Sequence, residues 1–254
     1  MSGEIRFRTE GPLARITIDR PPLNILCTAM LVELGQSLER ADSDDGTRLI
    51  RLDAEGKLFS AGVDVADHVG DRIEPMLEAL TRLFDVLESL SRPTISVVHG
   101  PALGGGCELA LATDLCFASE RASFGQPEIR LGQLAPPASV LLPRLVGERR
   151  ALELLLSGEA IPASEAERIG IVNRVFPEDR LEREVAARLE RLSELSGAAL
   201  RHAKRAVRAA RGLPAAEARR AVQQLYSEAL AGTADATEGP RAFLEKRPPR
   251  WKHA

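Results

Sequence analysis

The chain has 254 residues, of which 44% are hydrophobic, enough for a globular protein with one large core or a core with a small appended domain. A formal net charge of −3 excludes a strongly basic nucleic-acid footprint, and no apolar run approaches the ~18 residues of a membrane span. The three cysteines, Cys27, Cys107 and Cys116, lack zinc-type spacing and are odd in number. We therefore expect a reducing, cytoplasmic compartment, with Cys107 and Cys116 as small core residues.

Segments with strand and helix periodicity alternate in the first half of the chain. Short apolar runs, some alternating with polar residues, predict strands at 5–8, 14–18, 49–52 and 94–98. Apolar residues at helical spacing predict helices at 30–41 and 73–90. The order strand, crossover helix, strand favours an α/β layered core with parallel strand pairing.

The second half of the chain, from about residue 139, is mostly helical in pattern. Helices are predicted at 151–158, 181–195, 198–210 and 214–231, the first of them ending at Gly158. Residues 169–172 predict a short returning strand. A composition shift suggests two parts, residues 1–195 and residues 196–254.

An acidic residue stands in an otherwise small and apolar segment, GPALGGGCELALATDLC. Three glycines precede Glu108, follow a predicted strand and open a short predicted helix. Glycines let the backbone approach a ligand closely, and a helix N-terminus presents free N–H groups, so Gly105 and its neighbours could bind an anion or a developing oxyanion. A tight turn that needs glycine only for its shape is the alternative.

A second turn of small residues, FSAGVD at 59–64, also follows a predicted strand. Two such turns at the ends of neighbouring strands could direct two N–H donors at one acyl oxygen. In FGQPEI, Pro127 restricts the backbone and predicts that Glu128 lies on a stiff extended segment. If Glu108 and Glu128 converge in an apolar site, both cannot easily ionise, and they would form an acid/base pair.

The motifs FSAGVD, ALGGGCELALATD and FGQPEIRLG together resemble the crotonase superfamily, the enoyl-CoA hydratases and isomerases. The resemblance runs from IDRPPLN to the tail EGPRAFLEKRPPRW. It implies an α/β, crotonase-like ββα-superhelix core over 1–195 and a C-terminal helical trimerisation region over 196–254. A homotrimer or a dimer of trimers is expected.

The resemblance also implies roles for individual residues. The N–H groups of Val63 and Gly105 would form an oxyanion hole for a thioester carbonyl. Glu108 would activate a water molecule for syn addition at the β-carbon, and Glu128 would protonate the α-carbon. Ala61, with Gly62 and Asp64 in the same turn, would contact coenzyme A, and Lys246 would lie near its phosphates. No metal or separate cofactor is expected, since coenzyme A is part of the acyl-CoA substrate, and neither nucleic acid nor a membrane is expected as a partner.

One segment departs from the family pattern. Where many members have a glycine-rich turn after the second glutamate, residues 132–145 read GQLAPPASVLLPRL. A stiffer and more apolar wall suggests an acyl group other than a short straight chain, and the chain most resembles cyclic dienoyl-CoA hydratases of anaerobic aromatic degradation. An ordinary linear enoyl-CoA substrate remains the alternative.

Two other functions stay open at this point. A Δ3,Δ2-enoyl-CoA isomerase needs only one glutamate, so the presence of both favours hydration. A non-catalytic, RNA-binding member of the fold is suggested by the basic residues Lys204, Arg205, Arg208 and Arg211, although a solvated helix face explains them as well. His99 is expected to be a loop residue, His68 to border the site at most, and Trp251 to pack the C-terminal tail.

Overall fold

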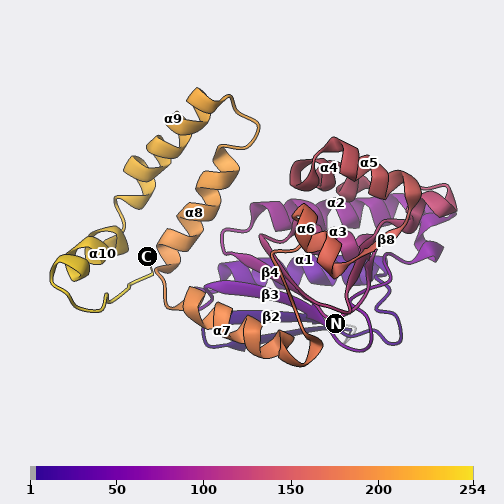
Figure 1. Ribbon diagram of the computed structural model, residues 1–254, viewed down its shortest axis with the longest axis horizontal. Helices are drawn as coiled ribbons and strands as arrows, with labels where there is room; N and C mark the ends of the chain where they lie inside the picture. Colours follow the sequence, from indigo (N-terminus) through magenta and orange to yellow (C-terminus); the bar gives the residue numbers. More distant parts are fainter. Residues whose placement is uncertain (1–3, 254) are drawn as a thin grey trace. The chain divides into compact units, whose positions relative to one another are not determined.

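The computed structural model describes residues 4–253, which divide into two compact units. Unit 1 comprises Met1–Leu90 and Thr94–Ala187, and unit 2 comprises Ser91–Pro93 and Arg188–Ala254 (Figure 1). The second unit therefore begins inside helix α7 (Leu181–Ser193), somewhat before the position at which the composition changes. Because α7 continues from one unit into the next, residue composition does not change at this boundary and cannot locate it.

A mixed sheet forms the centre of unit 1. Among the described residues its strands are, in spatial order, β1 (Ile5–Glu10), β2 (Leu13–Ile18), β3 (Leu49–Ala54), β4 (Thr94–Val98), β6 (Leu115–Ser119) and β9 (Arg174–Phe176). β1 pairs antiparallel with β2, and every later pair is parallel. The parallel pairing and the first four strands are as the sequence predicts.

One face of this sheet is covered by helices α1 (Thr28–Ser43) and α2 (Ile73–Ser89) (Figure 1). Both helices bury an apolar stripe, which includes Leu34 and Leu38 of α1 and Leu83 of α2. Ile16 and Leu52, paired across β2 and β3, belong to the same hydrophobic core. The sequence predicts this layer of sheet and helices because the apolar residues that recur at helical and strand spacing are the ones that are buried.

The opposite face of β2 and β3 carries charge. Arg51 and Asp53 are 4% and 3% exposed, and Arg51 Nε lies 2.7 Å from Asp53 Oδ2. Arg15 Nε lies 2.7 Å from the same oxygen, and Thr17 donates to Asp53 Oδ1 at 2.6 Å. Both guanidinium nitrogens of Arg51 also donate to Glu182 in the first turn of α7, at 2.6 and 2.7 Å. Each buried charge is therefore paired, as burial in a low dielectric requires.

A second, smaller sheet surrounds the glycine-rich segment. It pairs β5 (Ala102–Leu103), β7 (Ser123–Gly125) and β8 (Ala160–Pro162). Helix α3 (Gly105–Ala112) follows β5 directly, and the 3₁₀ helix η3 (Pro127–Leu131) follows β7. The sequence does not predict these strands, because two or three residues are too few to show a repeat.

The remaining elements are mostly helical. In unit 1 they are the 3₁₀ helices η1 (Val65–His68), η2 (Gly70–Arg72) and η4 (Glu178–Arg180) and the α-helices α4 (Pro136–Val146), α5 (Glu148–Ser157) and α6 (Ala163–Ile169). In unit 2 they are α8 (Gly197–Ala209), α9 (Ala215–Leu225), the π-helix η5 (Tyr226–Leu230) and α10 (Ala234–Leu244). No helix among residues 4–253 is both long and apolar enough to cross a membrane.

Two sequence predictions about these elements are wrong. The returning strand is β9, not residues 169–172, because Gly170 takes a left-handed conformation and ends α6. Glu128 lies in the first turn of the 3₁₀ helix η3 rather than on an extended segment. Pro127 does keep Gln126 out of the helical region (φ −123°, ψ 80°), but it then occupies a first helical position, which proline favours.

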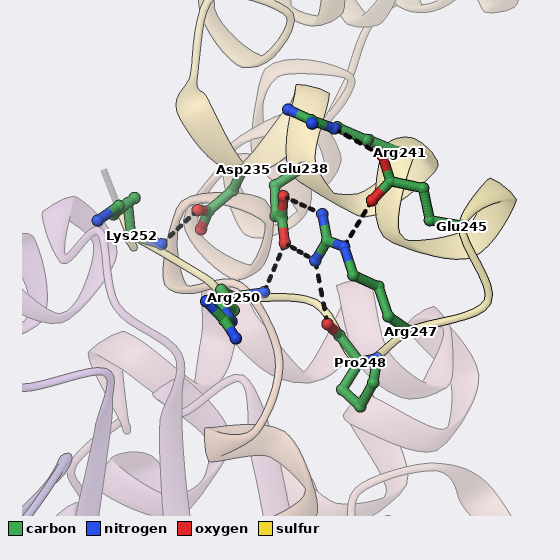
Figure 2. Close-up of polar contacts among 8 residues, drawn as sticks. All are labelled: Asp235, Glu238, Arg241, Glu245, Arg247, Pro248, Arg250 and Lys252. Carbon is green, nitrogen blue, oxygen red and sulfur yellow. Dashed lines mark hydrogen bonds and ion pairs between the residues drawn. The ribbon is translucent and has the colours of Figure 1, made fainter.

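The C-terminal tail of unit 2 is bound to α10 by two carboxylates (Figure 2). Glu238 accepts hydrogen bonds from the Arg247 guanidinium at 2.6 and 3.0 Å and from the Arg250 N–H at 2.7 Å. Asp235, which is 3% exposed, accepts from the Lys252 N–H at 2.6 Å. Trp251 Nε1 donates to the Glu194 carbonyl at 2.9 Å, so Trp251 packs the tail as predicted.

Candidate active site

The two turns of small residues lie against each other. Ser60 and Ala102 form a parallel bridge, and the Leu103 N–H donates to the Ser60 carbonyl at 2.9 Å. A Cβ added at Gly106 would lie 2.5 Å from the Ser60 Cβ, so only glycine permits this approach. Two loops that are far apart in the sequence are thereby joined into one backbone surface.

Two main-chain N–H groups meet at this junction. A Cβ added at Gly105 would lie 3.3 Å from the Val63 N and 2.6 Å from its Cγ2. Gly105 is the first residue of α3, where an N–H has no partner inside the helix. Within residues 4–253, neither the Val63 N–H nor the Gly105 N–H donates to a protein acceptor. Two neighbouring free donors can hold a single oxygen on which negative charge develops.

Both glutamates lie beside Gly104. The Glu108 N–H donates to the Gly104 carbonyl at 2.9 Å, and a Cβ added at Gly104 would lie 2.5 Å from Glu128 Oε1. Gly104 has φ +51° and ψ −129°, a conformation that is open essentially to glycine alone. The same glycine therefore starts the helix that carries Glu108 and leaves room for the side chain of Glu128.

The Glu108 side chain is held by the N-terminus of α4. It is 2% exposed, and its Oε1 accepts a hydrogen bond from the Ala138 N–H at 2.9 Å. Burial raises the pKa of Glu108 to about 8; the hydrogen bond from Ala138 opposes this rise, and the charge of Glu128 adds to it. The carboxyl therefore holds its proton far more strongly than an exposed glutamate does.

Glu128 shares the poorly hydrated surroundings. Burial raises its pKa as well, and its Oε2 is buried without a hydrogen-bond partner among the described residues. Two nearby carboxyls whose charged forms are both disfavoured titrate as a pair, and near neutral pH the pair can hold one proton. Such a pair can take a proton at one oxygen and deliver one from another, which is general acid–base chemistry.

Two groups that the sequence does not single out, the Ala138 N–H and Gln126, lie at or beside these residues, as does His68, which the sequence predicts to border the site at most. The Ala138 N–H contacts Glu108 directly, although no local pattern links the two residues. His68, whose Nδ1 lies 2.9 Å from the Asp64 carbonyl, faces Glu128 closely enough that its charge lowers the pKa of that carboxyl. Gln126 is 2% exposed with both amide atoms unpartnered in the described chain, and no spacing signal distinguishes it.

The residues expected to contact coenzyme A lie in two places. Gly62 has φ +108°, and its carbonyl accepts from the Leu26 N–H at 2.9 Å; Ala61, beside it, is half-buried. The Asp64 carboxylate accepts from the Ala66 N–H at 3.0 Å, so it caps the 3₁₀ helix η1. The positive φ of Gly62, its hydrogen bond with Leu26 and the cap formed by Asp64 together fix the conformation of this turn.

Lys246 belongs to unit 2, between α10 and the tail. Its side chain is exposed and it has φ +52°, which is uncommon for a residue other than glycine. The Arg247 N–H donates to the Ala242 carbonyl at 3.0 Å, the pattern of a Schellman helix end in which glycine is the usual residue at the position of Lys246.

The cysteines, His99 and Lys204 lie outside the group formed by the two glutamates and the two turns. Cys107 and Cys116 are buried core residues, as predicted, and burial raises the pKa of both thiols, that of Cys116 to about 12. His99 contacts the Gly56 carbonyl from a loop, also as predicted. Lys204 donates to the Arg92 carbonyl at 2.7 Å, so its charge contributes to the packing of unit 2. In the part of the chain that the structure describes, no three His, Cys, Asp or Glu side chains gather in a way that could hold a metal.

Comparison with known proteins places this arrangement in a family. Residues 8–254 match the family model described as enoyl-CoA hydratase/isomerase. The chain is 39% identical over 250 residues to cyclohexa-1,5-dienecarbonyl-CoA hydratase of Thauera aromatica, covering 98% of this chain and 96% of that protein. It is 38% identical to a probable enoyl-CoA hydratase of Rhizobium meliloti (strain 1021), covering 96% of each.

A solved structure agrees with these relatives. The crystal structure of enoyl-CoA hydratase from Bacillus anthracis superposes with a TM-score of 0.93 at 31% identity, covering 99% of this chain and 100% of that one. The chain therefore belongs to the enoyl-CoA hydratase/isomerase family, the crotonase superfamily. It is an enzyme of the hydratase type, a carbon–oxygen lyase.

Proposed function

We propose that this enzyme adds water in the syn sense to the C=C bond of an α,β-unsaturated acyl-CoA thioester, or removes it in the reverse direction. The observation that supports the proposal best is the grouping at Gly104 to Gly105, where two carboxyls of raised pKa adjoin two free main-chain N–H groups. Hydration requires both parts: an acid/base pair for the water and donors for the charge that reaches the thioester oxygen.

Each residue has one step in this proposal. In the reactive form of the pair the single proton is on Glu128, and the ionised Glu108 takes a proton from a water molecule while the water oxygen bonds to the β-carbon. The π electrons of the C=C bond move toward the thioester oxygen, and the N–H groups of Val63 and Gly105 stabilise the enolate-like oxygen. Glu128, which is protonated at the start, then gives its proton to the α-carbon, and transfer of the proton gained by Glu108 to Glu128 returns the pair to its starting state. Removing one donor of this kind typically raises the barrier by about 3 kcal/mol.

The first prediction concerns the glutamate pair. Glu108→Gln and Glu128→Gln, made separately, should each lower kcat at least about 100-fold, because each removes one proton transfer. The rate of hydration is followed with several enoyl-CoA esters. Glu159→Gln, at an exposed glutamate, is the matched control and should keep wild-type activity.

Two outcomes would count against the proposal. Near wild-type rates in both glutamine variants would show that Glu108 and Glu128 are not the catalytic acid and base. Product formed in heavy-oxygen water without incorporated label would show isomerisation, which moves a double bond and needs no water.

We propose a cyclic dienoyl-CoA as the preferred acyl group. The support is the similarity to the Thauera aromatica enzyme and the start of α4, where Pro136 and Pro137 stiffen the segment next to Glu108. Leu134 lies just before this helix and is 68% exposed, as a side chain free to contact an apolar ligand would be. A panel of linear, branched and cyclic enoyl-CoA esters tests the choice, and a higher kcat/KM for linear esters would contradict it.

Coenzyme A would enter as part of the substrate, with no separate cofactor; the turn at Ala61 to Asp64 would contact it, and Lys246 would reach the phosphates in a neighbouring subunit's site. The three cysteines are free, in keeping with a reducing cytoplasmic location. We propose a homotrimer or dimer of trimers, because the helices of unit 2 leave large apolar side chains exposed. These are Val207 (71%), Tyr226 (62%), Phe243 (83%) and Leu244 (80%). Several large exposed apolar side chains in one small helical unit favour a protein partner.

A further inference from the structure

The N-terminus of helix α4 is capped by a side chain from a different helix. Ala135 stands at the N-cap position and has no side-chain oxygen to accept a hydrogen bond from the first turn. The carboxyl of Glu108, a residue of another helix, accepts the Ala138 N–H instead. Ala138 is the third helical residue, one of the two whose N–H groups a capping side chain normally accepts.

The other such position is occupied by Pro137, which has no N–H. A carboxylate that accepts two or three N–H groups at a helix N-terminus becomes a stronger acid than one that accepts a single N–H group. Here Pro136 and Pro137 leave the first turn with a single donor near Glu108. Both prolines have helical φ values at no cost in hydrogen bonding, so the helix still begins at Pro136.

We propose that Pro137 is a positioning residue for Glu108: by withholding an N–H group it leaves Ala138 as the one main-chain donor to this carboxyl, so Glu108 keeps a proton affinity suited to exchange with water. The proposal rests on the proposed role of Glu108 as the proton acceptor. A carboxyl that was stabilised more strongly as its anion would be a poorer base.

Few other ionisable groups face Glu108. Glu128 on η3 acts on it by its charge, and Glu108 in turn acts on the thiol of Cys107 in α3. β4 (TISVV) and β5 (AL) have no ionisable side chain, and α2 buries only apolar residues. The charge of α4 itself is Arg144, in its last turn. The number of N–H donors at the start of α4 is therefore the variable that a substitution can change cleanly.

The test compares three proline-to-alanine variants of the same helix. Pro137→Ala adds an N–H at the capping position and should lower the pH at which Glu108 titrates by about one unit, a tenfold change in its ionisation constant. Pro136→Ala adds an N–H at the first position, outside the usual capping pair, and Pro143→Ala adds one in the helix interior. These two controls should leave the titration unchanged.

Two readouts are measured. Infrared titration follows the protonated carboxyl of Glu108 in the free enzyme, assigned by the difference from Glu108→Gln, and needs no activity at all. The pH profile of kcat should show the limb that depends on Glu108 moving by the same amount, with KM changed little.

An unchanged infrared titration in Pro137→Ala, or an equal shift in all three variants, would overturn the proposal. Pro137→Ser, which restores the same N–H with another side chain, should repeat the shift of Pro137→Ala, and its failure to do so would count as contrary. If the infrared shift occurs but no variant, wild type included, hydrates any acyl-CoA ester, the positioning stands and the proposed reaction fails.

Discussion

At the scale of single residues, Glu108 explains why an acidic side chain stands in an apolar segment. Its carboxyl is 2% exposed, next to a second glutamate and bonded to one main-chain N–H. A buried group of this kind destabilises the fold when it ionises, so its presence has to be justified by the chemistry that it performs. Activity and stability should therefore respond in opposite directions when it is neutralised.

A prediction on pH and stability follows from the pKa of Glu108. In the folded chain it is raised to about 8 from the ordinary 4.5, so between these values the folded state binds more protons than the unfolded state. The free energy of unfolding then falls as pH rises through this window. Glu108→Gln removes that fall, and at pH 8 the free energy of unfolding of the variant should exceed that of the wild type by on the order of 4 kcal/mol.

Urea unfolding at pH 5 and at pH 8 measures the effect. The two proteins should differ little at pH 5, where Glu108 is protonated in the folded state. Parallel pH dependences for the variant and wild type would show that Glu108 is ionised without penalty in the folded protein, contrary to its burial.

At the scale of elements, the charged face of the sheet is held to α7 by Arg51. Its side chain is 5% exposed and links Asp53 of β3 to Glu182 of α7. Removing one member of a buried ion network leaves a partner buried with less compensation, which typically destabilises by 3–5 kcal/mol. An exposed ion pair contributes far less because water screens it.

Arg51→Met should accordingly lower the free energy of unfolding by about 3 kcal/mol. Asp53 would keep Arg15 and Thr17, so the loss is expected toward the low end of the range. Arg121→Met is the matched control: its pair with Glu178 is 67% and 56% exposed, so water screens it and the loss of stability should be far smaller. Urea unfolding at pH 7 compares them, and equal losses would contradict a special role for the buried network.

The same scale shows which elements sequence patterns can predict. Strands β1 to β4 and helices α1 and α2 are predicted because apolar residues recur along each of them at a spacing typical of a strand or a helix. Helix α10 is not predicted, since it contains Gly239 and Pro240, and β5 and β7 are too short to carry a pattern. Glu128 is assigned to the wrong backbone conformation because proline suits both an extended segment and the start of a helix.

At the scale of the whole molecule, the two units differ in how completely they bury their apolar residues. Unit 1 encloses a large core, whereas α9 of unit 2 buries none of its residues within the described chain. A helix whose apolar face is at most half-buried within the described chain is consistent with a partner, and the proposed partner is another copy of the chain.

Phe243→Asp combined with Leu244→Asp should therefore dissociate the proposed trimer. Two buried carboxylates at an interface would be strongly unfavourable, and sedimentation equilibrium should show a decrease in mass toward that of one chain. Val69→Asp, at an exposed apolar residue of unit 1, is the control and should leave the mass unchanged. A wild-type protein that sediments as a single chain would remove the oligomer from the proposal.

The sequence by itself determined the α/β class, the parallel pairing, and the residues worth attention: two glutamates, two turns of small residues and a wall that contains prolines. These are visible because periodicity and residue type act locally. Only the tertiary structure decided that the turn at Val63 meets the turn at Gly105, that Gly104 adjoins Glu128, and that Ala138 donates to Glu108. Such contacts join residues that are distant in the chain, and packing alone brings them within hydrogen-bonding range.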